Sequence, residues 1–180
     1  MSTVIFIIIA VIALPFFVAL VLPKDYSIER SIIINAPKHE VFDYLKYLKH
    51  QEQYSKWTMA DPQQKITTTG TDGTVGFIIA WDSAKKSGAG AQEITSIIDG
   101  ERITTELRFI RPFKSVGHSW LTTEAATEHS TKVSWGISGT MAYPLNAMTA
   151  VMKGALAKDI DISLHNLKVI LEGRSSEPLQ

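Results

Sequence analysis

The chain has 180 residues, in which 18 Lys and Arg residues balance 18 Asp and Glu residues, and it contains no Cys. Zero net charge without a long basic run excludes a nucleic-acid-binding surface. The lack of Cys excludes disulfides, thiolate zinc sites, a Cys nucleophile and a lipoprotein anchor. The mean hydropathy of +0.06 averages two populations. Residues 4–22 carry no polar side chain, whereas the remainder has a mean hydropathy of about −0.3, ordinary for a soluble domain of single-core size.

The first segment, residues 4–22, has the length of a membrane-spanning helix. It would span about 28 Å, close to the ~30 Å hydrocarbon core of a bilayer. A cleaved signal peptide needs a basic start and a small-residue cleavage site, and neither flank supplies one. A buried core helix is the other alternative, but this helix would be apolar all round. We therefore predict a single-pass membrane anchor over residues 1–23, in which Pro15 is tolerated.

The orientation of this anchor follows from the basic residues beside it. Lys24 and Arg30 come directly after the apolar segment, and no basic residue precedes it. Because cytoplasmic flanks carry the excess of Lys and Arg, we expect the domain on the cytoplasmic side of the membrane.

The domain begins with a predicted strand over Tyr26–Asn35, which is rich in Ile. Asn35 is a candidate helix cap and Pro37 suits the first turn of a helix extending to Leu48. Gln51–Trp57 is predicted to form a second short helix.

The middle of the chain consists of β-branched and aromatic runs of strand length. These runs are Lys65–Thr69, Val75–Trp81, Ala89–Ile98, Arg102–Ile110, Ser115–Glu124 and Thr131–Ser138. The separators between them are short and have turn chemistry, such as Asp99-Gly100. Short separators indicate antiparallel hairpins.

The last predicted element is a helix of about 40 Å over Leu145–Leu171, with an apolar stripe at intervals of three and four residues. Gly173 is its expected stop, and residues 174–180 are expected to form a flexible tail. The element order predicts an α+β fold in which a curved antiparallel sheet wraps around the long C-terminal helix, preceded by the transmembrane helix. A curved sheet cannot touch a cylinder along its full length, so a gap remains that is either filled by large side chains or left as a pocket.

Several short motifs in this order resemble the START-like (SRPBCC) superfamily, in its polyketide cyclase/dehydrase-like branch. They are Tyr26–Pro37 followed by Val41-Phe42, Trp57 with Asp61-Pro62, Phe77–Trp81, Gly88–Gly90, Glu101–Ile103 and Thr131–Trp135. The resemblance covers Tyr26–Glu172 and implies a helix-grip domain over residues 24–173 with an internal cavity for hydrophobic ligands. It implies no shared catalytic set, because members include lipid carriers, ligand sensors, aromatase/cyclases and chaperone-associated modules.

The chain offers no motif for a metal or cofactor. The five His residues show no i, i+4 pairing and no clustering with carboxylates. No nucleophile elbow is present, and Gly88-Ala89-Gly90 lacks the third glycine of a dinucleotide loop. We therefore expect no metal and no cofactor.

Strand alternation identifies the residues that face the helix. It places Leu107 and Phe109 inward and Glu106 in solvent between two arginines. For Ser115–Glu124 two registers are possible. If Trp120 faces inward, His118 lies in the cavity and is a weak candidate for acid–base catalysis. In the other register, which we favour, His118 faces water.

The sequence thus predicts a membrane-anchored START-like domain that binds a hydrophobic small molecule or lipid in an internal cavity. The candidate ligand-binding residues are Phe77, Ile79, Trp81, Leu107, Phe109, Trp120, Trp135, Met148, Met152 and Leu156. The alternatives are a cyclase or dehydratase using a cavity His or carboxylate, and a protein-interaction module with a filled core. No nucleic-acid partner is expected, and the sequence does not indicate an oligomeric state.

Overall fold

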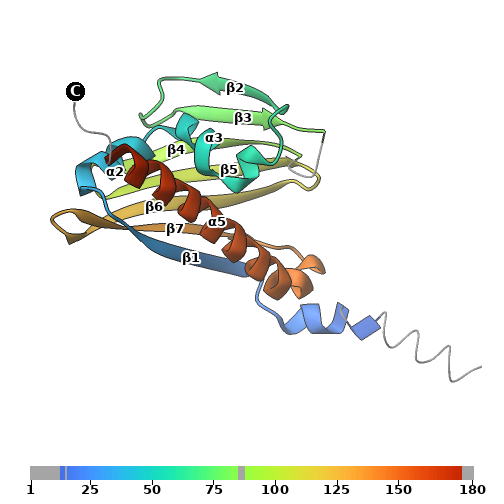
Figure 1. Ribbon diagram of the computed structural model, residues 1–180. Helices are drawn as coiled ribbons and strands as arrows, with labels where there is room; N and C mark the ends of the chain where they lie inside the picture. Colours follow the sequence, from blue (N-terminus) through green and yellow to red (C-terminus); the bar gives the residue numbers. More distant parts are fainter. Residues whose placement is uncertain (1–12, 15, 85–87, 176–180) are drawn as a thin grey trace, which may run out of the picture.

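The computed structural model describes residues 13–14, 16–84 and 88–175 (Figure 1). A curved sheet of seven antiparallel strands has the order β1-β7-β6-β5-β4-β3-β2. Its strands are β1 (Asp25–Ile34), β2 (Lys65–Thr69), β3 (Ile78–Asp82), β4 (Ala89–Ile98), β5 (Arg102–Arg111), β6 (Ser115–Thr127) and β7 (Ser130–Thr140). The six strands from β2 to β7 follow one another as hairpins, and β1 closes the far edge beside β7.

The helices lie in two groups. After β1 come α2 (Lys38–Leu45), the 3-10 turn η1 (Leu48–His50), α3 (Gln51–Tyr54) and α4 (Lys56–Met59). After β7 come the 3-10 turn η2 (Leu145–Met148) and the long helix α5 (Thr149–Ser175). Figure 1 shows α5 crossing one face of the sheet. The predicted α+β helix-grip fold is confirmed.

The hydrophobic core lies under the C-terminal half of α5. Ile160, Leu164 and Leu167 of this helix are fully buried, and they belong to the same cluster as Ile94 and Val133 of the sheet. These residues come from the apolar stripe of the helix and from the inward positions of the strands, so the two predicted periodicities meet in one core.

Several predicted helix boundaries are wrong. The first helix ends at Leu45 and not at Leu48, the predicted Gln51–Trp57 helix is divided into α3 and α4, and α5 begins at Thr149 after the turn η2. Asn35 does not cap α2, because the N-cap position is Pro37, which makes no side-chain cap bond. Gly173 does not end α5, which continues to Ser175. The Glu172 carboxylate accepts a hydrogen bond of 2.8 Å from the backbone N–H of Asn35. This contact holds the last turns of the helix against the end of β1 and favours its continuation past glycine.

Most of the predicted membrane anchor, residues 4–12 and Pro15, lies outside the described residues. In the part of the chain that the structure describes, no helix combines the length and apolar character needed to cross a membrane.

Candidate functional site

A cavity of about 650 Å³ lies between the sheet and the N-terminal half of α5. Met152 and Leu156 contribute the helix side of the wall, while Trp57 and Thr58 of α4 close one flank. The volume falls within the range of about 300–1,000 Å³ that is typical of small-molecule sites. The gap between sheet and helix is therefore open at this end of the domain.

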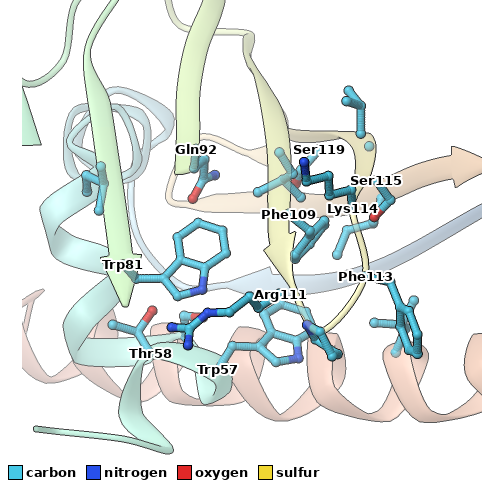
Figure 2. Close-up of a pocket in the computed structure, with 18 of the residues that line it drawn as sticks. Trp57, Thr58, Trp81, Gln92, Phe109, Arg111, Phe113, Lys114, Ser115 and Ser119 are labelled. Atoms are coloured by element: carbon cyan, nitrogen blue, oxygen red, sulfur yellow. The ribbon is translucent and has the colours of Figure 1, made fainter. Parts of the chain in front are cut away.

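The sheet side of the cavity is apolar and aromatic. Its side chains come from the inward positions of β3, β5 and β7 and include Ile79, Trp81, Leu107, Phe109, Trp135 and Ile137. The rings of Trp81 and Phe109 meet edge to face, with centroids 5.9 Å apart (Figure 2). Trp57 and Trp135 meet in the same way at 5.6 Å. These pairs hold large rings at the cavity wall in fixed orientations.

A small polar group lies in the floor of the cavity. The Gln92 amide, which points into the cavity in Figure 2, donates a hydrogen bond of 3.0 Å to the hydroxyl of Thr105. The Ser119 hydroxyl accepts a hydrogen bond of 2.9 Å from the Trp135 indole and donates one of 3.0 Å to the Gly136 carbonyl. A few polar groups in an apolar cavity are the usual means of orienting a bound molecule.

The cavity opens between two loops. One is the β5–β6 connection with the adjoining strand ends, where Arg111–Val116 line the opening, and the other is the segment between β7 and η2, where Met141, Ala142 and Leu145 line it. Phe113 lies at this mouth with 67% of its surface exposed, and Figure 2 shows it beside Lys114 and Ser115. The Arg111 guanidinium pairs with the Asp82 carboxylate at the end of β3.

Few titratable groups reach the cavity. Burial raises the pKa of the Tyr26 phenol, which therefore stays neutral at physiological pH. Glu52 is the carboxylate among the described lining residues, and it is exposed. Among the described residues no group of three or more His, Asp and Glu side chains could hold a metal ion.

Most of the sequence-predicted binding residues line the cavity. These are Ile79, Trp81, Leu107, Phe109, Trp135, Met152 and Leu156. Their contact with a ligand stays a prediction.

The remaining three predicted binding residues lie elsewhere. Phe77 is 1% exposed and belongs to the packed core. Trp120 lies on the outer face of the sheet, where its indole donates a hydrogen bond of 2.6 Å to Glu29. Met148, in η2, is mostly exposed and does not line the cavity.

The candidate catalytic residue His118 is also outside the cavity. The inward residues of β6 are Gly117, Ser119 and Leu121, so His118 is exposed on the outer face. The register that we favoured is confirmed, and the inward alternative for His118 is wrong.

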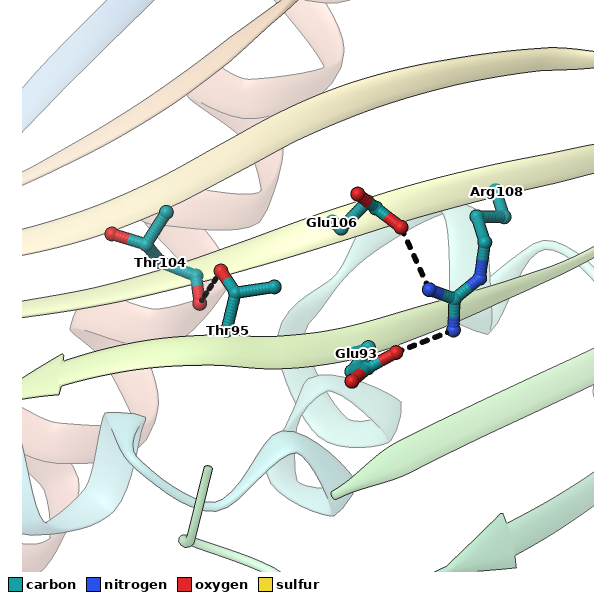
Figure 3. Close-up of polar contacts among 5 residues, drawn as sticks. All are labelled: Glu93, Thr95, Thr104, Glu106 and Arg108. Atoms are coloured by element: carbon teal, nitrogen blue, oxygen red, sulfur yellow. Dashed lines mark hydrogen bonds and ion pairs between the residues drawn. The ribbon is translucent and has the colours of Figure 1, made fainter. Parts of the chain in front are cut away.

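Glu106 lies on the same outer face, as predicted. It accepts a hydrogen bond of 2.7 Å from Arg108, whose second guanidinium nitrogen contacts Glu93 at the same distance (Figure 3). The two carboxylates raise the pKa of Arg108 further above its usual value. This group is an ion-pair cluster on the outer face and is remote from the cavity.

Sequence reasoning missed the mouth and the polar floor. The sequence predicts a turn at Arg111-Pro112 and assigns Ser115 and Val116 to the next strand, and nothing in that pattern identifies the cavity mouth. The inward position of Ser119 becomes visible only with the register of β6, which the sequence left open.

A family model described as "Polyketide cyclase / dehydrase and lipid transport" matches residues 25–172. No curated protein matches the chain.

Several solved structures share the fold. The Zhui aromatase/cyclase from Streptomyces sp. R1128 superposes with a TM-score of 0.65 at 12% identity, covering 84% of this chain and 96% of that one. The norcoclaurine synthase from Thalictrum flavum, solved with dopamine and hydroxybenzaldehyde, gives 0.63 at 7% identity, covering 89% and 94%. The Aha1 protein from Colwellia psychrerythraea gives 0.56 at 18% identity, covering 82% and 96%.

At these identities the structural likeness shows the fold alone. The family match, in contrast, spans nearly the whole domain after the apolar segment, in agreement with the START-like resemblance of the sequence motifs. The chain therefore belongs to the polyketide cyclase/dehydrase and lipid transport family within the START-like superfamily.

Proposed function

We propose that this protein is a membrane-anchored domain that binds a hydrophobic small molecule or a lipid in its internal cavity. The observation that carries the proposal is the apolar, aromatic wall of a cavity of about 650 Å³. An occupant that buries roughly 300 Å² of apolar surface there would gain about 7.5 kcal/mol before the costs of association, at about 25 cal/mol per Å². The floor group around Gln92 would orient one polar end of the occupant.

The two alternatives have less support. An enzyme of cyclase or dehydratase type needs an acid–base group in the cavity, whereas His118 faces solvent and Glu52 lies exposed at the edge. A module with a filled core conflicts with a cavity of this size. Two of the structurally similar proteins are described as an aromatase/cyclase and a synthase, but a shared fold does not transfer an activity.

The anchor is part of the proposal. Residues 4–22 have the length and the purely apolar composition of a spanning helix. The basic side chains of Lys24 and Arg30 follow it, which favours a cytoplasmic domain. Carbonate-washed membranes are expected to retain the intact chain, and its release into the supernatant would contradict a spanning helix.

Ligand binding is tested by identifying what the detergent-extracted protein carries, using native mass spectrometry and lipid extraction. We expect an apolar compound to co-purify with the wild type. Ile79→Trp replaces an aliphatic side chain of the cavity wall by a large indole ring and should lower the amount of the co-purifying compound at least several-fold. Ile98→Trp is the matched control, because Ile98 is half exposed and does not line the cavity.

Two results would overturn the binding proposal. One is a wild-type protein that carries no apolar compound and binds no hydrophobic dye. The other is an Ile79→Trp variant that keeps its circular dichroism spectrum and still carries as much of the compound as the Ile98→Trp control.

A further inference from the structure

Exposed apolar side chains occur in the two segments that line the mouth of the cavity and in the residues next to them in the sequence. They come from two segments, residues 110–116 and 143–151, which we call the mouth surface. Its exposed members are Ile110, Phe113, Val116, Tyr143, Leu145, Met148 and Val151. Large apolar patches are rare on surfaces that face only water and mark interaction sites.

The apolar N-terminal segment is attached to the same end of the domain. The Asn146 amide nitrogen donates hydrogen bonds to the carbonyl oxygens of Ala19, at 2.6 Å, and Leu22, at 3.0 Å. Asn146 is fully buried and Ala19 is 2% exposed. The Met141 backbone N–H donates a hydrogen bond of 2.8 Å to the Lys24 carbonyl. In Figure 1 this segment leaves the domain beside the start of α5.

These contacts restrict how the domain can sit on its anchor. Asn146 satisfies two carbonyls at the C-terminal end of the apolar segment, where a helix leaves such groups without partners. Because Asn146 belongs to η2, the end of the anchor and the mouth surface are held within a few residues of each other. A domain swinging freely on a flexible linker would not need this attachment.

Charged side chains beside the mouth surface have the sign that suits lipid headgroups. Lys24, Lys114 and Lys153 are exposed, and basic side chains near a membrane surface are attracted to anionic lipids. Of the nearby carboxylates, Asp82 pairs with Arg111, whereas Asp25, which accepts a hydrogen bond of 2.7 Å from the Thr140 hydroxyl, and Glu52 keep their negative charge beside the three lysines.

From these observations we propose that the mouth surface lies in the headgroup layer of a lipid bilayer, so that the cavity opens onto the membrane. The partner is the bilayer itself, and the occupant of the cavity enters from it without crossing water. This inference rests on the anchor of the proposed function, and it adds the orientation of the domain and the route of the occupant.

The proposal is tested by the depth of single labels. The chain has no Cys, so Phe113→Cys and Val151→Cys each give one site for a fluorescent label, and His129→Cys gives a control at the exposed β6–β7 turn. The labelled full chains are reconstituted into vesicles of phosphatidylcholine and phosphatidylglycerol at about 3:1. Quenching by brominated lipid is compared with quenching by iodide in the water.

We expect brominated lipid to quench the labels at positions 113 and 151 at least several-fold more than the label at 129, and iodide to show the reverse order. Quenching of positions 113 and 151 mainly by iodide would mean that the mouth faces water and would overturn the proposal. Protection of these positions from both quenchers would mean that protein covers the mouth, such as a second copy of the chain, and would overturn it as well.

The attachment at Asn146 is tested in the same vesicles. Asn146→Ala should lower lipid quenching at position 113 while the chain still floats with the vesicles. Unchanged quenching in a folded Asn146→Ala variant would show that this contact does not orient the domain.

Failure of this inference can be told apart from failure of the proposed function. Flotation of the vesicles reports the anchor, and dye binding in detergent reports the cavity. Water-exposed labels on a chain that floats and binds dye would overturn the orientation alone, whereas loss of flotation or of dye binding would overturn the proposed function.

Discussion

The hydrogen bond between Trp135 and Ser119 allows a sharp test of the cavity floor. Ser119→Ala removes the acceptor of the Trp135 indole N–H, which lies 2.9 Å from the Ser119 oxygen. Both residues are nearly inaccessible, with exposures of 3% and 4%. Water therefore has little access to replace the lost partner.

The expected loss of stability is about 2 kcal/mol. A buried donor left without a partner costs about 1–3 kcal/mol. For a protein of this size that corresponds to a drop in melting temperature of roughly 4–8 °C. The assay is thermal and urea unfolding of the full chain in a mild detergent, followed by circular dichroism and tryptophan fluorescence. Ser96→Ala is the control, because Ser96 is exposed on β4 and its loss should change stability by no more than about 0.5 kcal/mol.

A double-mutant cycle isolates the contact. In a Trp135→Phe background there is no indole N–H to satisfy, so Ser119→Ala should cost only about 1 kcal/mol, for the bond to Gly136. An equal cost in both backgrounds, or a single-variant loss no larger than that of Ser96→Ala, would refute the assignment of this hydrogen bond to the stability of the site.

Three further variants test other parts of the fold. Burial raises the pKa of Tyr54, whose hydroxyl has no hydrogen-bond partner among the described residues. The contribution of Tyr54 to the free energy of unfolding should therefore be full below about pH 10, where the phenol of the unfolded chain is neutral, and fall by about 1.4 kcal/mol per pH unit above it. Tyr54→Phe should lessen this fall, measured by urea unfolding at pH 9 and 11. An equal fall in the variant and the wild type would contradict the prediction. In Gly136→Ala the new methyl group would collide with the Trp120 ring, so we expect thermal unfolding to show a loss of stability of about 1–3 kcal/mol. A change below about 0.5 kcal/mol, as for surface variants, would count against the packing of the Trp120 ring over Gly136. Gly154→Ala meets open space on α5 and should gain up to about 1 kcal/mol, whereas a loss would show that this turn is not helical in solution.

The inward faces of several strands could be predicted because one periodicity decides them. In β5, Leu107 and Phe109 alternate with Glu106 and Arg108. Only the first pair can face the interior without burying charged groups away from water. The same reasoning placed Ile79 and Trp135 on the inner face. Element order and hairpin turns then sufficed for the fold class.

Alternation alone does not decide the face of β6, because both of its registers contain apolar residues, although the sequence favours the register in which His118 faces water. The structure turns the small residues Gly117 and Ser119 inward and the large ring of Trp120 outward. Trp120 covers Gly136 of the neighbouring strand, and a side chain at that glycine would occupy the position of the ring. A rule that places large aromatic rings inside gives the wrong face, because the ring of Trp120 packs over Gly136, its opposite partner on β7, and this match depends on the register between the two strands.

The same pairing of small and large residues explains why a cavity exists at all. Near the mouth, the inward positions of β4 and β6 are Gly90, Gln92, Gly117 and Ser119, all short or polar, while β5 between them supplies the larger Leu107 and Phe109. Toward the other end of the same strands the inward positions are Ile94 and Leu121, which pack in the core with Leu164 and Leu167. The sheet is therefore packed along one half of its strands and hollow along the other. A side chain at position 90 would collide with the Trp81 ring and the Arg108 carbonyl. The glycine is therefore required by the packing of its neighbours, and the same glycine leaves part of the cavity open. Because the hollow half is also the end where Lys24 joins the domain, the residues that create the cavity and those that attach the N-terminal segment lie at the same end of the fold.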